Sequence, residues 1–287
     1  MREWVSINGR LMPAEQGRVS VFDSAFSQGV GLFETMRTYG EMVFRLDHHL
    51  NRLIRSARLL GWAVLPEIDA LRENVEQIVS GAEAEDARVR LTVTTGSLRA
   101  SEDEPPQLTI VASASPGASY PPECYRNGVT VTIAPYRQGP TDPTVGHKTT
   151  SYFARLSSLR EAHAKGAFEA IWLTHQNLLA EGAISSLFIV RDERVFTPPL
   201  DTPVLPGITR ATVIEIADRA RIKVEEAALT IDDLLSADEV FLTNSLMEIM
   251  PVVRVERKGI GTEKPGDVTR VLYEAYGKLV ETECAYA

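Results

Sequence analysis

The first third of the chain alternates between short strand-like segments and amphipathic stretches. Apolar and polar residues alternate in "ARVRLTVTTG" and "QLTIVAS", which is typical of strands buried on one face. "EWVSI" ends at the turn-forming pair Asn8-Gly9, and "LFETMRTY" is followed by Gly40 and "MVFRL", so each predicts a hairpin. The combination with two predicted helices indicates an α+β domain over residues 1–114.

The two helices are predicted from apolar residues at helical spacing. In "DHHLNRLIRSARLLG", Asp47 is a candidate N-cap and Gly61 ends the helix. The apolar stripe of this helix consists of Leu50, Leu53, Ile54, Ala57 and Leu60. The second helix is predicted from about Pro66 to Ala82.

A change of composition divides the chain. "SPGASYPPE", residues 115–123, contains small residues and three prolines and is typical of a linker. After it come the strand-like segments "GVTVTIA", "EAIWLT", "LLAEGA", "SLFIVRD" and "RVFTP", a helix opened by "LPGITR", and a terminal helix. We therefore expect a second domain over residues 124–287.

Composition excludes several classes of protein. The net charge of −9 argues against a nucleic-acid or polybasic membrane-binding surface. No apolar run approaches the length of a membrane span, and "MREWVSINGRLM" has no apolar signal segment, so we expect a cytoplasmic protein. Cys124 and Cys284 are far apart, and no HExxH or CxxC spacing occurs, so neither a disulfide framework nor a metal site is predicted.

Lys148 lies in "GHKTTSYFARLSSLREA", directly before a helix predicted over residues 149–165. A lysine acts as a nucleophile where partial burial disfavours its ammonium form. A lysine beside a helix start is usually a solvated charge, so this segment alone leaves both roles open.

Two other segments complement a reactive lysine. "LPGITR" places the backbone N–H groups of Ile208 and Thr209 at a predicted helix N-terminus, which favours a phosphate. In "LLAEGAISSLF", Glu181 interrupts residues typical of a buried strand, so it must lie at a rim or pair with a cation. A lysine, a phosphate site and a buried carboxylate are the three groups that pyridoxal 5′-phosphate (PLP) requires.

The chain resembles the class IV aminotransferase family over nearly its whole length. These fold-type IV PLP enzymes include branched-chain and D-amino acid aminotransferases and 4-amino-4-deoxychorismate lyase. Six motifs occur in the family's order: "FSQGVGLFETMRTY", "HLNRL", "HKTTSY", "EGAISSLF", "LPGITR" and "DEVFLTNSLMEIMPV". The resemblance implies a small N-terminal α/β sandwich, a larger C-terminal PLP-binding domain with a pseudo-barrel sheet, and a homodimer.

The resemblance also implies roles for individual residues. Lys148 is expected to hold PLP as an aldimine and to move a proton between the substrate Cα and the cofactor. Glu181 is expected to pair with the pyridine nitrogen, and Arg52 of "HLNRL" with the phosphate. Further phosphate contacts are implied for Ile208, Thr209 and Ser245.

The motifs leave the reaction open. Phe33 and Thr95 stand where D-amino acid aminotransferases have a tyrosine and a carboxylate-binding arginine, although Arg99 could substitute. Arg90 matches both branched-chain and lyase-like members, and Tyr152 is a further candidate substrate contact. "LPGITR" favours aminotransferases, whereas "LFETMR" and "TNSLMEIMPV" favour lyases.

We therefore expect an aminotransferase that moves an amino group between an amino acid and a 2-oxo acid by a ping-pong mechanism. The alternative is a 4-amino-4-deoxychorismate lyase that releases pyruvate to give 4-aminobenzoate. A non-catalytic PLP-binding relative is a more remote alternative, because such a protein would be expected to lose the lysine or the phosphate site.

Overall fold

The computed structural model describes residues 4–82, 86–99 and 107–285. The chain forms two compact units: unit 1 contains Met1–Ser119, His147–Ser151 and Thr282–Ala287, and unit 2 contains Tyr120–Gly146 and Tyr152–Glu281. The division after Ser119 falls inside the segment predicted as a linker. Residues 147–151 group with unit 1, whereas the predicted boundaries assign them to the C-terminal domain.

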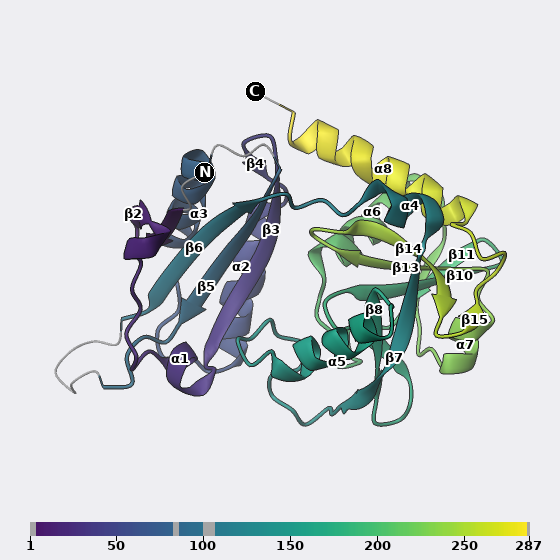
Figure 1. Ribbon diagram of the computed structural model, residues 1–287, viewed down its shortest axis with the longest axis horizontal. Helices are drawn as coiled ribbons and strands as arrows, with labels where there is room; N and C mark the ends of the chain where they lie inside the picture. Colours follow the sequence, from purple (N-terminus) through teal and green to yellow (C-terminus); the bar gives the residue numbers. More distant parts are fainter. Residues whose placement is uncertain (1–3, 83–85, 100–106, 286–287) are drawn as a thin grey trace. The chain divides into compact units, whose positions relative to one another are not determined.

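Unit 1 is built on a six-stranded sheet with the order β2-β1-β6-β5-β3-β4 (Figure 1). Its strands are β1 (Trp4–Ile7), β2 (Arg10–Pro13), β3 (Gly31–Tyr39), β4 (Met42–Val43), β5 (Ala87–Thr94) and β6 (Thr109–Pro116). Neighbouring strands pair antiparallel throughout. The hairpin predicted at Asn8-Gly9 is confirmed, and both residues have positive φ, as this turn requires.

Helices α2 (Leu46–Leu59) and α3 (Ile68–Ala82) cover one face of this sheet. Unit 1 also contains η1 (Ala14–Gln16) and α1 (Ser24–Gln28). Apolar side chains of β3 and β5 pack against both helices, with Leu32, Met36 and Leu91 fully buried. Alternation along a strand therefore directs Phe33 of β3 and Arg90 of β5 to the opposite face.

Helix α2 begins one residue before the predicted N-cap. Its N-cap is Arg45, which has a φ of 56° and makes no side-chain cap. Asp47 lies in the first turn instead, where its negative charge interacts favourably with the helix dipole. Its carboxylate also forms an ion pair with Arg72 of α3 at 2.6 Å. The predicted end is confirmed, because Gly61 follows the C-cap and adopts a φ of 71°.

Unit 2 contains a nine-stranded sheet with the order β12-β11-β10-β13-β14-β7-β8-β9, and β15 pairs with β14. Its strands are β7 (Val129–Gln138), β8 (Glu169–Thr174), β9 (Leu179–Gly182), β10 (Ser186–Arg191), β11 (Arg194–Thr197), β12 (Val224–Glu226), β13 (Glu239–Asn244), β14 (Glu248–Val255) and β15 (Lys258–Gly259). Strand β9 is the edge strand at one end of this order, yet a short turn joins it to β10, which lies near the opposite end. The sheet must therefore curl into an incomplete barrel, which confirms the predicted pseudo-barrel.

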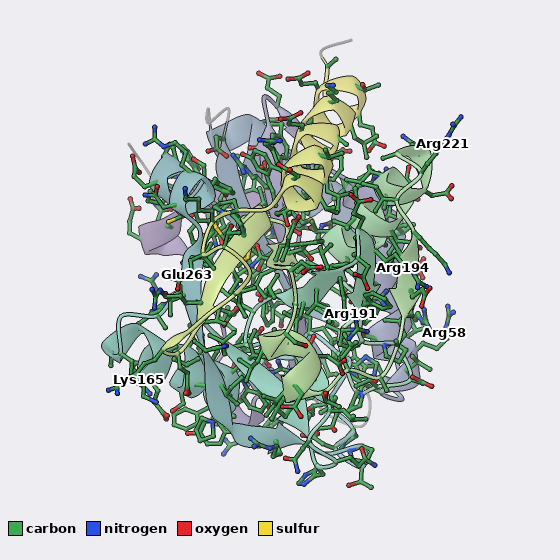
Figure 2. All side chains as sticks on the ribbon, turned by 90° about the vertical axis from the view of Figure 1, so that its right-hand side faces the viewer. Arg58, Lys165, Arg191, Arg194, Arg221 and Glu263 are labelled. Atoms are coloured by element: carbon green, nitrogen blue, oxygen red, sulfur yellow. The ribbon has the colours of Figure 1, made fainter. Side chains whose placement is uncertain are left out.

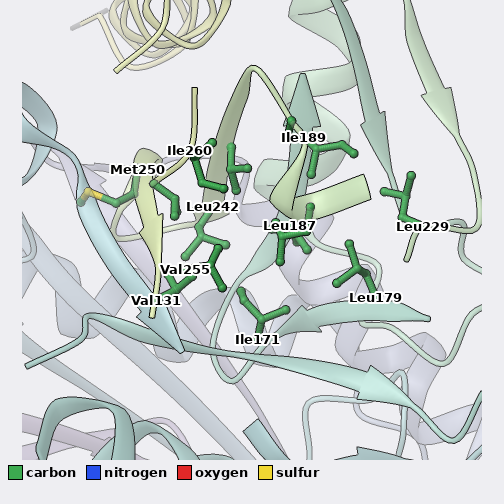
Figure 3. Close-up of a cluster of buried hydrophobic side chains, with 14 of the residues drawn as sticks. Val131, Ile171, Leu179, Leu187, Ile189, Leu229, Leu242, Met250, Val255 and Ile260 are labelled. Atoms are coloured by element: carbon green, nitrogen blue, oxygen red, sulfur yellow. The ribbon is translucent and has the colours of Figure 1, made fainter. Parts of the chain in front are cut away.

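The interior of this curled sheet is filled by aliphatic side chains. Figure 3 shows Val131, Ile171, Leu187, Leu242 and Met250 converging from five different strands. The helices of this part of the chain are α4 (Pro122–Asn127), α5 (Phe153–Ala164), α6 (Ile208–Arg219), α7 (Ile231–Leu235) and α8 (Asp267–Glu283). Within the described residues, no helix is both long enough and apolar enough to cross a membrane.

Candidate active site

Lys148 is held against strand β3 by backbone hydrogen bonds on either side of it. Its carbonyl oxygen accepts from the N–H of Phe33 at 2.8 Å, and the N–H of Thr150 donates to the carbonyl of Gly31 at 2.9 Å. Thr149 forms the intervening bridge with Leu32. These contacts correct the predicted helix over residues 149–165. Helix α5 begins only at Phe153, because residues 149 and 150 are used for strand pairing.

The amine of Lys148 lies against an aromatic ring. Its Nζ is 4.5 Å from the centroid of Phe33, and the guanidinium carbon of Arg90 is 3.9 Å from the same centroid. Lys148 is half-buried, which fits the partial desolvation expected of a reactive lysine. The structure thus brings together three of the predicted residues. Arg99 is exposed and stacks on Phe22 instead, at 3.7 Å.

Arg52 of α2 forms a buried ion pair with Glu34 of β3. The Arg52 Nε donates to Glu34 Oε1 at 2.8 Å and the Nη2 to Oε2 at 2.5 Å. His49 Nδ1 lies 2.8 Å from the same Oε2. The side chains of Arg52 and Glu34 are only 9% and 1% exposed. Arg52 is therefore not a solvated helix charge like Arg58, whose side chain extends away from the ribbon in Figure 2.

The pKa values of Glu34 and His49 in this cluster both lie below their ordinary values. Burial alone would raise the pKa of Glu34, but Arg52 and the hydrogen bond with His49 outweigh it and lower that pKa to about 2. Burial lowers the pKa of His49 below its ordinary value, against the raising effect of Glu34. At neutral pH, Glu34 is therefore ionised and a neutral His49 donates its Nδ1–H to it. The result is a fixed guanidinium at the position predicted to meet a phosphate.

Glu181 lies in β9 of unit 2 and is 5% exposed. Its Oε1 accepts from Arg155 Nη2 at 2.5 Å and from Gln138 Nε2 at 2.9 Å. Its Oε2 accepts from the backbone N–H of Leu205 at 2.9 Å. Of the two alternatives that the sequence leaves open, the rim position is wrong and pairing with a cation is confirmed.

The turn at residues 182–185 directly follows Glu181. The N–H groups of Ala183 and Ile184 and the hydroxyl of Ser185 donate to the carboxylate of Glu169, at 3.2, 3.1 and 3.0 Å. The Glu169 carboxylate also accepts from the N–H of Ala170 at 2.8 Å. Glu169 is fully buried, and its carboxylate holds this turn in place through these hydrogen bonds.

The carbonyl groups of the same turn are bound from outside. The carbonyl of residue 182 accepts from Arg155 Nη1 at 2.9 Å, and that of residue 183 from the Tyr152 hydroxyl at 3.0 Å. The carbonyl of residue 184 accepts from Asn244 Nδ2 at 3.0 Å. A side chain at Gly182 would overlap Ser185 and press against Glu169, so only glycine fits there. These bonds fix the backbone that carries Glu181.

Burial raises the pKa of Glu169 to about 7, against the lowering effect of its four hydrogen bonds. The folded protein therefore holds this proton more tightly than the unfolded chain does, where the pKa is about 4.5. The free energy of unfolding should fall, by up to about 3 kcal/mol from this group, as pH rises through that interval. Glu169→Gln cannot titrate, so its unfolding free energy should change less between pH 5 and pH 8.

Urea denaturation at several pH values measures this difference. Both proteins retain His49, so the difference between their pH profiles isolates Glu169. Glu123→Gln is the control, because Glu123 is exposed and should leave the wild-type profile unchanged. Parallel profiles for wild type and Glu169→Gln would contradict the assignment.

In unit 2, the residues predicted to contact a phosphate lie at the start of helix α6 and in the turn that follows β13. Helix α6 begins at Ile208, as predicted, and its N-cap Gly207 provides no side-chain cap to the first turn. Thr209 is 3% exposed. Ser245 follows β13 in a turn where Asn244 Oδ1 accepts the N–H groups of residues 246 and 247. Tyr152 is the N-cap residue of α5 and contacts the 182–185 turn through its hydroxyl.

Comparisons with known proteins agree with this architecture. The family model of class IV amino-transferases matches residues 31–255. The branched-chain-amino-acid aminotransferase of Salmonella typhimurium is 32% identical over 290 residues, which cover 98% of this chain and 94% of that protein. The D-alanine aminotransferase of Bacillus licheniformis is 30% identical over 283 residues, which cover 98% of each chain.

A structural match extends over the same length. The crystal structure of a T.th. branched-chain amino acid aminotransferase with pyridoxamine 5′-phosphate has a TM-score of 0.90 at 28% identity, and the match covers 98% of this chain and 94% of that chain. The chain is thus an enzyme with the fold-type IV architecture. It belongs to the class IV aminotransferase family, whose members depend on PLP.

Sequence reasoning missed Glu34 and His49, which surround Arg52 in unit 1, and Arg155 and Glu169, which lie around Glu181 and its turn in unit 2. The signal that identified Glu181, a carboxylate within an apolar strand, is equally present in "GLFETM" and "FEAIWLT". It would therefore have identified Glu34 and Glu169. No comparable signal distinguishes Arg155 from the other arginines of helical segments.

Proposed function

We propose that this protein is a PLP-dependent aminotransferase that transfers an amino group between an amino acid and a 2-oxo acid by a ping-pong mechanism. The observation that carries the proposal is the placement of Lys148: a half-buried amine over Phe33, on a backbone pinned to β3. Full-length similarity to two kinds of amino acid aminotransferase supports the same reaction.

Two further observations support a fit between these residues and the cofactor. An ionised carboxylate offers about four acceptor positions. The described residues of the chain occupy three of them at Glu181, so Oε2 can accept one more donor such as a protonated ring nitrogen. The first turn of α6 also has no side-chain cap, so the N–H groups of Ile208 and Thr209 suit a phosphate oxygen.

When bound, PLP supplies an electron-withdrawing ring that makes the α-proton of an amino acid easier to remove. In our proposal, the Lys148 amine would hold the cofactor through its aldehyde and, when free, would accept and return the proton of the substrate Cα. Glu181 would keep the ring nitrogen protonated. Arg52, Ile208, Thr209 and Ser245 would bind the phosphate, and the same residues would serve both the amino acid and the 2-oxo acid half-reactions.

We propose that the substrate carboxylate binds at the face of the unit 1 sheet that carries Phe33 and Arg90. Arg90 lies beside the Phe33 ring that also carries the Lys148 amine, and Tyr152 and Arg99 are further proposed contacts. Because the Salmonella relative is a branched-chain-amino-acid aminotransferase, aliphatic amino acids are the first donors to test. Because another relative is a D-alanine aminotransferase, the same experiment includes donors of both configurations at Cα.

We also propose that the enzyme is a homodimer. Large apolar side chains are exposed in one short segment of unit 1, namely Val19, Val21, Phe22, Phe26 and Val30. Phe26 is 74% exposed. Such a concentration of apolar surface favours a protein interface, and a second copy of the chain is the partner that the family resemblance implies.

A donor series tests the proposed function. PLP-loaded protein is mixed with L-branched-chain amino acids, D-alanine, L-glutamate and aromatic amine donors, one at a time. The cofactor absorption and the 2-oxo acid released are followed together. We expect one donor class to convert the cofactor to pyridoxamine phosphate with an equivalent of 2-oxo acid. If no donor does so, aminotransfer is contradicted, and pyruvate release from aminodeoxychorismate becomes the reaction to assay.

A further inference from the structure

Arg155, in the first turn of α5, is held rigidly against Glu181. Its Nη2 is 2.5 Å from Glu181 Oε1, and its Nη1 donates to the carbonyl of Gly182 at 2.9 Å. The guanidinium carbon lies 4.6 Å from the ring centroid of Trp172. The side chain is 17% exposed, so little water screens the ion pair.

The surroundings of Arg155 keep it in this orientation. The Trp172 indole N–H donates to Ser158 Oγ at 2.9 Å, and that hydroxyl donates to the carbonyl of Arg155 at 2.8 Å. The aromatic face, the hydroxyl and the backbone of α5 therefore form one connected group. A guanidinium fixed in this way is a permanent neighbour of the carboxylate rather than a mobile surface charge.

The hydrogen bonds of Glu181 divide between its two oxygens. Among the residues that the structure describes, Oε1 accepts from both Arg155 and Gln138, whereas Oε2 accepts from the Leu205 N–H. Gln138 and Leu205 would keep the carboxylate oriented without Arg155. The distinct contribution of Arg155 is therefore its positive charge, which lies directly against the carboxylate and opposes its negative charge.

We propose that Arg155 shares the charge of Glu181 and so weakens the attraction of Oε2 for a protonated ring nitrogen. Arg155 is in this sense a positioning residue that acts through Glu181, and the inference rests on the proposed function. A ring that holds its proton less firmly withdraws electrons less strongly. Arg155 thus limits the electron withdrawal that the bound cofactor exerts on substrate.

The attraction can be measured by binding, independently of activity. The full-length apoprotein is titrated with PLP and with 1-deazapyridoxal 5′-phosphate, which has carbon in place of the ring nitrogen. The ratio of the two dissociation constants reports on the contact at the nitrogen. We expect Arg155→Gln to raise the preference for PLP about tenfold over wild type, because the carboxylate charge is no longer shared.

Three variants complete the test. Arg155→Lys retains the charge and should keep the wild-type ratio within about twofold. Arg160→Gln, on the exposed side of the same helix, is the matched control and should not change the ratio. Arg155→Met keeps the aliphatic packing on Trp172 and replaces the glutamine variant if that variant does not fold.

The outcomes are distinguishable. A ratio for Arg155→Gln that is unchanged or lower overturns the inference, as does a rise in Arg155→Lys as large as in Arg155→Gln. Glu181→Gln should remove the preference for PLP, and a preference that survives in that variant overturns both the role of Glu181 and the inference. Failure of wild-type apoprotein to bind PLP at all contradicts the proposed function itself.

Discussion

Lys148→Ala is expected to lower kcat by at least about 10³-fold while leaving the fold intact. In the proposed mechanism, the Lys148 amine both attaches the cofactor and transfers the α-proton, and the variant lacks this amine. The loss of its cation–π contact with Phe33 should cost folding about 1 kcal/mol. The strand pairing of residues 148–150 uses backbone atoms and should survive.

The measurement is steady-state turnover with the donor that the proposed donor series identifies, together with thermal unfolding of each protein. Lys165→Ala is the matched control, because Lys165 lies at the exposed C-terminal end of α5 (Figure 2). Turnover of Lys148→Ala within tenfold of wild type would exclude this lysine as the nucleophile.

Glu181→Gln is expected to lower kcat by about 10² to 10³-fold. An amide carries no charge with which to keep a ring nitrogen protonated. It also cannot satisfy all of its neighbours, because Arg155, Gln138 and the Leu205 N–H are all donors and the amide nitrogen is another donor. We expect a loss of folding stability of about 1 to 3 kcal/mol from this mismatch.

Turnover and PLP affinity are measured on the same preparation of Glu181→Gln. Glu161→Gln on α5 is the control, because that carboxylate is exposed and its hydrogen bond from the Tyr136 hydroxyl can be retained by the amide oxygen. If Glu181→Gln turned over at the wild-type rate, Glu181 would not face the ring nitrogen.

Much of the fold follows from local pattern. The Asn8-Gly9 hairpin, helices α2 and α3 and strands β7 to β11 lie where alternation or helical spacing predicts them. The predicted strand "MVFRL" is shorter, because only Met42–Val43 pair with β3 and α2 begins at Leu46. The start of α5 also differs from the prediction, because residues 149 and 150 pair with β3, more than one hundred residues earlier in the chain. A pairing of that range depends on tertiary structure and leaves no periodicity in the sequence.

The candidate site shows the same division between local and distant information. Burial of Glu181 and its need for a cation follow from the cost of an isolated carboxylate, but the identity of its partner does not. Arg155 meets Glu181 only because α5 and β9 are neighbours in unit 2. In the sequence, nothing distinguishes Arg52 from the surface charges of its helix, and its burial becomes evident only with Glu34 and His49 beside it.

The central claim, that Lys148 binds the cofactor, is tested most directly by borohydride trapping. PLP-loaded protein is reduced, digested and analysed by peptide mass spectrometry. Reduction converts a lysine-bound cofactor into a stable adduct on that lysine. We predict one major adduct, on the peptide containing Lys148, and its absence from Lys148→Ala. A major adduct on any other lysine, or none above the level found in Lys148→Ala, would contradict the account.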